Sequence, residues 1–153
     1  MGDAGTIAVS NALSECKVSK LQELDLSGNG IGPPGGEALG NMLLVHTSLT
    51  DLNLSSNNLT GGMYAKESEL PGSNFKSGDK VIYEGQELTV LAPKNSNGFV
   101  LLGSVEGIIA IADALGVKTS LTALDLRYNE LGNEGKAPLQ QAVQGRSGFD
   151  LKM

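Results

Sequence analysis

The sequence predicts an α/β fold in which short parallel strands form one layer, helices form a second layer, and a small β-meander is inserted. Three observations support this prediction. One eleven-residue pattern occurs three times, and helix-like segments lie between and around its copies. One interval between copies is much longer than the other, and within it the hydrophobic period changes from helical to alternating.

The repeated pattern is L-x-x-L-x-L-x-x-N-x-[LI], which occurs at Leu21–Ile31, Leu49–Leu59 and Leu121–Leu131. Successive side chains of a strand point to opposite faces, so the spaced leucines predict a strand that buries one face. The copies begin 28 and then 72 residues apart, so the second interval contains an insertion of 44 residues. We therefore expect Leu24, Leu52 and Leu124 to be neighbours in one parallel sheet.

Helix-like segments, with apolar residues at i, i+3 and i+4, cover residues 5–13, 37–49, 109–121 and 135–143. The strand, loop, helix and loop together make a unit of 28 residues. This unit resembles the ribonuclease-inhibitor type of leucine-rich repeat. The resemblance implies a leucine-rich repeat arc, with the parallel sheet on its concave side and helices on its convex side, formed by residues 1–59 and 104–153.

The stretch after the first copy contains Gly30, Gly32 and Gly35 in the order G-x-G-x-x-G, which is also the fingerprint of a dinucleotide-binding loop. Pro33 and Pro34 lie inside it and have no backbone N–H to offer a pyrophosphate. The glycines are not repeated in the other copies. We therefore predict a tight strand-to-helix turn and no cofactor.

The asparagine of the pattern, in contrast, recurs as Asn29, Asn57 and Asn129. A buried amide at the end of a strand can satisfy backbone groups of neighbouring turns that would otherwise lack partners. We therefore interpret these three side chains as structural rather than catalytic.

The residues between the leucines face the concave side and form the predicted partner-binding surface. These are Glu23, Asp25, Asp51, Asn53, Asp125, Arg127 and Tyr128. Repeat proteins commonly bind on this side, and an acidic face favours a basic protein segment. A merely solvated sheet face is the alternative interpretation.

Residues 60–103 form the predicted inserted subdomain. Three strands are expected, at about 80–83, 88–91 and 99–102, joined by Gly- and Asn-containing turns. The G-D-x-V opening resembles small Tudor- or KOW-like barrels, which would imply RNA or ribosomal partners, but the segment is not basic. Its four aromatic residues are predicted to fill a small core, with a second recognition surface as the alternative; they are Tyr64, Phe75, Tyr83 and Phe99.

Composition narrows the functional classes. The net charge of −6 disfavours nucleic-acid binding, and no apolar run is long enough to cross a membrane. A single cysteine, Cys16, excludes an internal disulfide, favours a cytoplasmic or other reduced intracellular compartment, and is interpreted as a small buried residue. The single histidine, His46, has no nearby Cys or second His. No metal site, catalytic set or enzymatic activity is predicted.

The predicted function is a non-catalytic protein–protein interaction module. The alternative is a regulator of a small GTPase, which the resemblance implies through the activators of Ran, with Arg127 as the candidate stabilising arginine. Because Met1 aligns with Ile31 and Leu131, the chain begins inside a repeat. This favours an excised fragment, or a subunit that oligomerises or docks into a larger complex through an open N-terminal edge.

Overall fold

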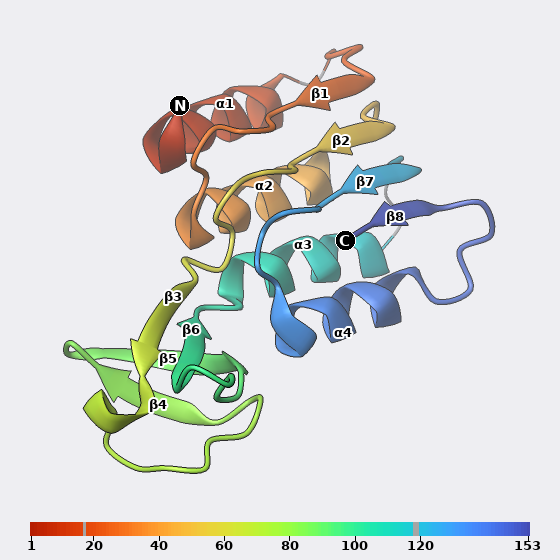
Figure 1. Ribbon diagram of the computed structural model, residues 1–153. Coiled ribbons are helices and arrows are strands. Elements are labelled where there is room, and N and C mark those ends of the chain that lie inside the picture. The colour runs from red at the N-terminus through yellow and green to blue at the C-terminus, as the bar shows by residue number, and fades with distance from the viewer. Residues whose placement is uncertain (17, 118–119) are drawn as a thin grey trace.

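The computed structural model describes residues 1–16, 18–117 and 120–153. Figure 1 shows two separate β-sheets, with a row of helices stacked against one of them. The first sheet and the helices form the repeat stack, built from both ends of the chain. The second sheet, the inserted sheet, comes from the middle of the chain.

The sheet of the repeat stack is parallel and has the strand order β1-β2-β7-β8. Each strand has three residues: β1 is Glu23–Asp25, β2 is Asp51–Asn53, β7 is Ala123–Asp125 and β8 is Asp150–Lys152. Leu24 pairs in register with Leu52, and Leu52 with Leu124. This confirms that the repeat register resumes after the long interval. The fourth strand, β8, was not predicted.

Four helices cover one face of this sheet: α1 (Gly2–Glu15), α2 (Pro33–Val45), α3 (Glu106–Gly116) and α4 (Gly132–Val143). The pattern leucines point toward the helices. Leu26, Leu52, Leu54, Leu124 and Leu126 are buried, and they form one core with apolar residues of α2, α3 and α4. Each fully buried leucine contributes about 1.5–3 kcal/mol, so the pattern positions hold the stack together.

Glycines bring helices α2 and α3 into close contact. A Cβ on Gly40 would lie 2.5 Å from the carbonyl carbon of Ala110, and one on Gly36 would lie 3.2 Å from the Cα of Gly107. A side chain at position 40 would therefore collide with backbone, and one at position 36 would fit only if the neighbouring helix shifted slightly. This explains part of the glycine-rich sequence around α2 as helix packing rather than turn formation.

The start of α2 is occupied by a carboxylate from α1. Asp3 Oδ1 accepts hydrogen bonds from the backbone N–H groups of Gly32 (2.7 Å) and Gly35 (2.9 Å). Because Pro33 and Pro34 have no N–H, these are the first donors that the helix can offer. A carboxylate there also interacts favourably with the positive end of the helix dipole. The donors that resembled a phosphate-binding loop are thus already in use.

The inserted sheet is antiparallel and has the strand order β3-β6-β5-β4. Its strands are β3 (Met63–Lys66), β4 (Lys80–Tyr83), β5 (Gln86–Ala92) and β6 (Phe99–Gly103), with a short 3-10 helix, η1, at Glu67–Glu69. Strands β4, β5 and β6 occupy the positions that the sequence indicated. Strand β3 precedes these three strands and was not predicted.

The inserted sheet has a small core of its own on one face. Val81, Val90, Val100 and Leu102 are buried there with three other apolar residues, and two aromatic side chains, Phe75 and Tyr83, pack against them. Tyr64 does not join this core, because 58% of its surface is exposed. The expectation that all four aromatic residues fill the core is therefore wrong for Tyr64, and Phe99 is not among the residues that pack against this core either.

The chain leaves the repeat stack before the inserted sheet and returns to the stack after it at the same point. The Ser104 N–H donates to the Thr60 carbonyl at 2.7 Å, which closes the two ends of the insertion. Strand β5 packs against α4, and a Cβ on Gly132 would lie 2.4 Å from the Leu91 carbonyl oxygen. Leu91 is 1% exposed and lies outside the small core of the insertion, so it belongs to this contact.

Two further sequence-based points concern Cys16 and membranes. Cys16 follows α1 and is exposed, so its interpretation as a small buried residue is wrong. Among the helices that the structure describes, none is long and apolar enough to span a bilayer.

Candidate functional site

The face of the repeat sheet opposite the helices is the candidate site, and we call it the open sheet face. It contains a hollow of about 260 Å³ that spans all four strands. Its polar lining residues are Glu23, Asp25, Asp51, Asn53, Asp125, Asp150 and Lys152. Five of the seven residues predicted from the sequence line this hollow. Arg127 and Tyr128 lie beyond the ends of the strands and do not line it.

Two contributors to this hollow were not predicted, because both come from the unexpected strand β8. Asp150 lies beside Ala123, and Lys152 lies beside Asp125. The signal for β8 was the alternation Phe149-Asp150-Leu151-Lys152-Met153, in which the apolar residues point toward the core. It was missed because the asparagine of the pattern does not follow it.

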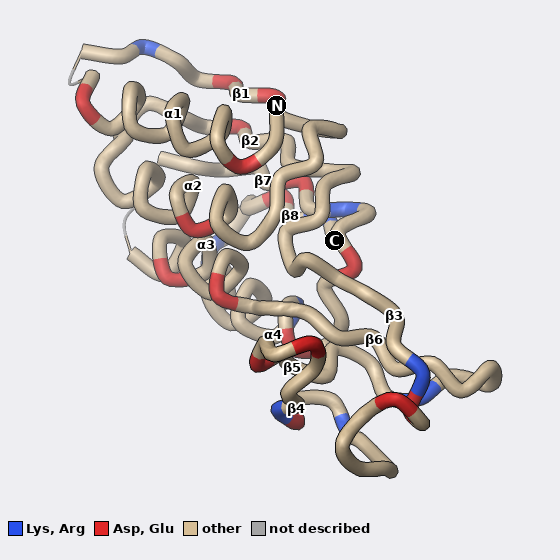
Figure 2. The backbone as a smooth tube through the Cα atoms, turned by 90° about the vertical axis from the view of Figure 1, so that its left-hand side faces the viewer, with Lys and Arg blue, Asp and Glu red and all other residues tan. Residues whose placement is uncertain are grey.

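The open sheet face carries an excess of negative charge. Together with Arg127 it has five carboxylates and two cations, which gives a net charge of −3 at neutral pH. Acidic positions on β1 and β2 are visible as red segments in Figure 2. Glu23 and Asp51 are exposed and lie opposite each other on adjacent strands. Like charges placed directly across a pair of strands repel each other modestly.

The last residue of each pattern strand also shapes the loop that follows. Asp25 Oδ1 accepts the Ser27 N–H, Asn53 Oδ1 accepts the Ser55 N–H, and Asp125 Oδ1 accepts the Arg127 N–H. These side chains satisfy backbone donors where each strand ends. Asp25, Asn53 and Asp125 therefore have a structural role in addition to the binding role predicted for them.

Both cations of the open sheet face are paired. Arg127 donates from Nε and Nη2 to the carboxylate of Asp125, with distances of 2.6 to 3.1 Å. Lys152 Nζ lies 3.1 Å from Asp150 Oδ2. The carboxylates of Glu23 and Asp51 belong to no ion pair among the residues that the structure describes. The free negative charge is therefore concentrated on β1 and β2.

These contacts change the acidity of three groups. The hydrogen bond from Arg127 lowers the pKa of Asp125 below its usual value, and the pKa of Arg127 is raised in return. The backbone N–H of Ser27 is the main cause that lowers the pKa of Asp25. Both carboxylates are consequently ionised at neutral pH, which keeps the open sheet face acidic.

The asparagines of the pattern form the ladder that was expected. Asn57 Oδ1 accepts the backbone N–H groups of Asn29 and Ile31, and Asn57 Nδ2 donates to the Leu26 and Leu54 carbonyls. Asn129 repeats this arrangement one strand further: its Oδ1 accepts the Leu59 N–H, although 70 residues separate the two, and its Nδ2 donates to the Leu54 and Leu126 carbonyls. Their structural role is thereby confirmed.

Other candidate sites give no chemical function. No group of three or more metal-binding side chains occurs among residues 1–16, 18–117 and 120–153. His46 is 5% exposed and follows the last turn of α2, away from the open sheet face.

Comparison with known proteins identifies the repeats. Three segments, residues 19–40, 45–62 and 117–137, match the family described as Leucine Rich repeat. They contain the three pattern copies and the strands β1, β2 and β7. A search of curated proteins finds no match. Domains of this family generally mediate protein–protein interactions and are typically non-enzymatic. These three segments, which together cover less than half of the chain, are similar to leucine-rich repeats, and the parallel sheet formed by their strands agrees with that similarity.

Proposed function

We propose that this chain is a protein-interaction module whose open sheet face binds a basic segment of a partner protein. The observation that carries the proposal is the hollow across β1, β2, β7 and β8, which five carboxylates line with one lysine. A cationic segment placed there would relieve the repulsion between neighbouring carboxylates. The opposite charges would also accelerate the encounter and orient the segment.

Glu23 and Asp51 are the residues that contribute most to this proposal. Both are exposed, both lie on the open sheet face, and neither accepts a backbone N–H from the loop that follows its strand. Asp125 contributes less because Arg127 neutralises it. The proposed order of importance therefore differs from the sequence-based prediction, which weighted all these residues equally.

The experiment uses a fluorescein-labelled octapeptide of alternating lysine and serine as the probe. The test variant is Glu23→Lys with Asp51→Lys, and fluorescence anisotropy measures its affinity at low and high salt. The matched control is Glu37→Lys with Asp113→Lys, which changes the net charge equally on the exposed surfaces of α2 and α3.

We expect the test variant to lose at least tenfold in affinity and most of its salt dependence, because screening acts over about 8 Å at physiological ionic strength. The control pair should lose less than threefold. Equal losses in the two variants would show that the peptide senses net charge alone, and the proposal would be wrong.

No observation favours the alternative of a GTPase regulator. An arginine that stabilises phosphoryl transfer must reach the nucleotide of its partner. Arg127 instead holds both oxygens of Asp125 with charge-assisted hydrogen bonds.

A further inference from the structure

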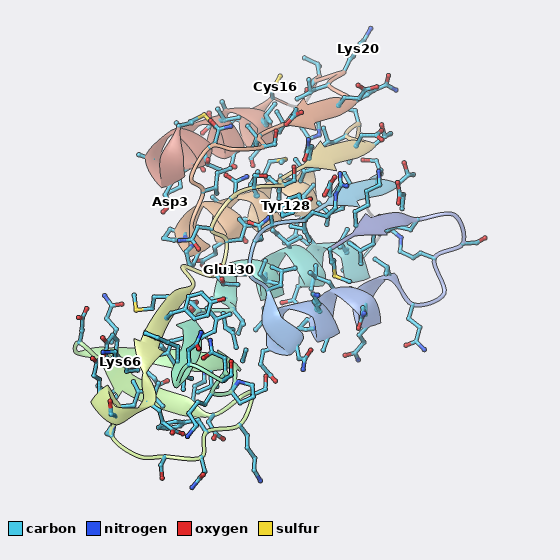
Figure 3. All side chains as sticks on the ribbon, in the orientation of Figure 1. Asp3, Cys16, Lys20, Lys66, Tyr128 and Glu130 are labelled. Carbon is cyan, nitrogen blue, oxygen red and sulfur yellow. The ribbon has the colours of Figure 1, made fainter. Side chains whose placement is uncertain are left out.

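A second hollow lies where the repeat stack meets the inserted sheet, and we call it the tyrosine hollow. Its volume is about 210 Å³, and the argument rests on six of its lining residues: Tyr64, Leu126, Tyr128, Glu130, Lys136 and Met153. They come from β3, from the loop between β7 and α4, from α4 and from the end of the chain. Figure 3 shows Tyr128 and Glu130 in this loop, on the side of the inserted sheet.

The backbone at this hollow has an unusual conformation for the residues it carries. Tyr128 has φ 60° and Glu130 has φ 51°, which is the left-handed region. One repeat unit supplies glycine at the same two positions, because Gly28 and Gly30 both have φ 65°. A bulky residue in this region is strained, and such strain persists where the surrounding structure imposes it. The third copy therefore places two side chains at the hollow where glycine would be conformationally easier.

The exposure of the two tyrosines is equally unusual. Tyr128 is 77% exposed and Tyr64 is 58% exposed, although each carries a large apolar ring. Tyrosine is among the side chains that most often dominate the binding energy of protein interfaces. Two such rings beside one hollow make it a candidate anchor site for a side chain of a partner.

The size and lining of the hollow specify what fits it. Sites for small-molecule ligands usually have about 300–1,000 Å³, so this hollow suits a single side chain better than a cofactor. Leu126 and Met153 supply apolar surface together with the two rings, and Lys136 adds a positive charge. Glu130 carries the opposite charge, so the lining has no net charge, and its apolar surface favours an apolar guest.

We propose that the tyrosine hollow receives a bulky apolar side chain, aromatic or aliphatic, from the same basic segment that lies on the open sheet face. This inference rests on the proposed function. The two hollows are close to each other along the chain, because Asp125 lines the first, and Leu126 and Tyr128 line the second. Three residues of extended chain span about 10 Å, so one short peptide reaches both. The partner motif is thus a basic stretch followed or preceded, after a short spacer, by an apolar anchor.

The first experiment compares peptides of equal charge on the whole chain. The alternating lysine–serine octapeptide is extended by two glycines and then by phenylalanine or by alanine, with the extension placed at either end. We expect the phenylalanine peptide to bind about tenfold more tightly than its alanine counterpart in one of the two orders, which corresponds to burial of one large apolar side chain.

Two glycine variants test whether the tyrosine hollow is the source of the higher affinity for the phenylalanine peptide. Tyr128→Gly removes an anchor ring while relieving the left-handed strain, so the variant should melt at the same or a higher temperature and lose the gain from phenylalanine. Ser56→Gly is the matched control, because Ser56 has φ 57° at the corresponding position of the preceding repeat and does not line the tyrosine hollow. This control should keep the full gain.

The outcomes separate the two proposals. If both peptides bind equally in both orders, or if the gain survives in Tyr128→Gly, the tyrosine hollow is not the anchor site. If neither peptide binds, the proposed function is wrong, and the hollow is then judged by a probe without basic residues. N-acetylphenylalanine amide, titrated into the ¹⁵N-labelled chain, should shift amide signals of Tyr64, Tyr128 and Lys136. No shift there, or a larger one with N-acetylarginine amide, would overturn the inference.

Discussion

The repeat stack and the inserted sheet hold together in different ways. Each strand of the stack has three residues, and its backbone pairs with strands that are 27 to 72 residues away in the sequence. The inserted strands have four to seven residues, and β4, β5 and β6 pair with their neighbours along the chain. The stack therefore depends on contacts between repeats, whereas the insertion depends on local pairing and a small core.

This difference has a consequence for the asparagine ladder. In the stack, one side chain substitutes for backbone pairing that three-residue strands cannot provide. Asn129 does this across the insertion. Its Nδ2 donates to the carbonyls of Leu54 and Leu126, and its Oδ1 accepts the Leu59 N–H. The continuity of the stack thus depends strongly on a single residue at the point where the chain is interrupted.

The largest effect is therefore expected for Asn129→Ala. Asn129 is 1% exposed, and its removal leaves several buried backbone groups without partners, each of which costs about 1–3 kcal/mol. We expect the free energy of unfolding to fall by about 3 kcal/mol or more, measured by urea denaturation followed by circular dichroism.

Asn29→Ala is the matched control at the edge of the same ladder. Asn29 is partly exposed, and its amide donates to Ser27 within its own loop. Its replacement should cost about 1 kcal/mol, since water can replace the lost partner. Equal losses in the two variants would show that the ladder does not concentrate stability at the junction.

The same difference explains which parts of the fold could be predicted from the sequence. Pattern positions in the stack share one physical role, so Leu24, Leu52 and Leu124 could be aligned without knowledge of the structure. The register, the helices and the role of the asparagines followed from that alignment. Five predicted acidic or polar residues were placed together on one face for the same reason, because strand side chains alternate.

The remaining features lack a repeated signal. Strand β8 has the apolar alternation of the other strands without their asparagine, and β3 is an edge strand whose side chains at positions 63, 64 and 66 are exposed. The pairing of Arg127 with Asp125 depends on rotamers that no pattern encodes. The placement of Tyr64 and Tyr128 beside one hollow depends on how the insertion packs on α4, which no repeated pattern in the sequence indicates.

A smaller effect is expected when the insertion is removed. Replacing residues 61–102 with two glycines should leave a stack that unfolds cooperatively, because Thr60 and Ser104 are already hydrogen-bonded and a shorter loop lowers the entropy cost of closure. The loss of Leu91 from its contact with α4 should lower the free energy of unfolding by about 2 kcal/mol.

Leu91→Ala in the whole chain is the control for that deletion. It keeps the insertion and removes most of the apolar contact, so it should destabilise the stack by a similar amount. A deletion variant that unfolds without cooperativity, while Leu91→Ala remains cooperative, would show that the stack needs the inserted sheet for its own core.

The smallest effect concerns acid and the pair formed by Asp125 and Arg127. Arg127 lowers the pKa of Asp125 below the usual value of 3.8. A carboxyl group with a lowered folded-state pKa stabilises the fold above its unfolded pKa, and this contribution is lost as the pH falls below about 4.

Arg127→Met should therefore flatten the decline in melting temperature between pH 5 and pH 3. The change in this decline should be small, because the Arg127 side chain is 52% exposed and water screens the pair. Lys20→Met, which removes an exposed charge before β1, is the control and should leave the slope unchanged. A parallel decline in wild type and Arg127→Met would mean that the backbone N–H of residue 127 alone maintains the ionised form of Asp125.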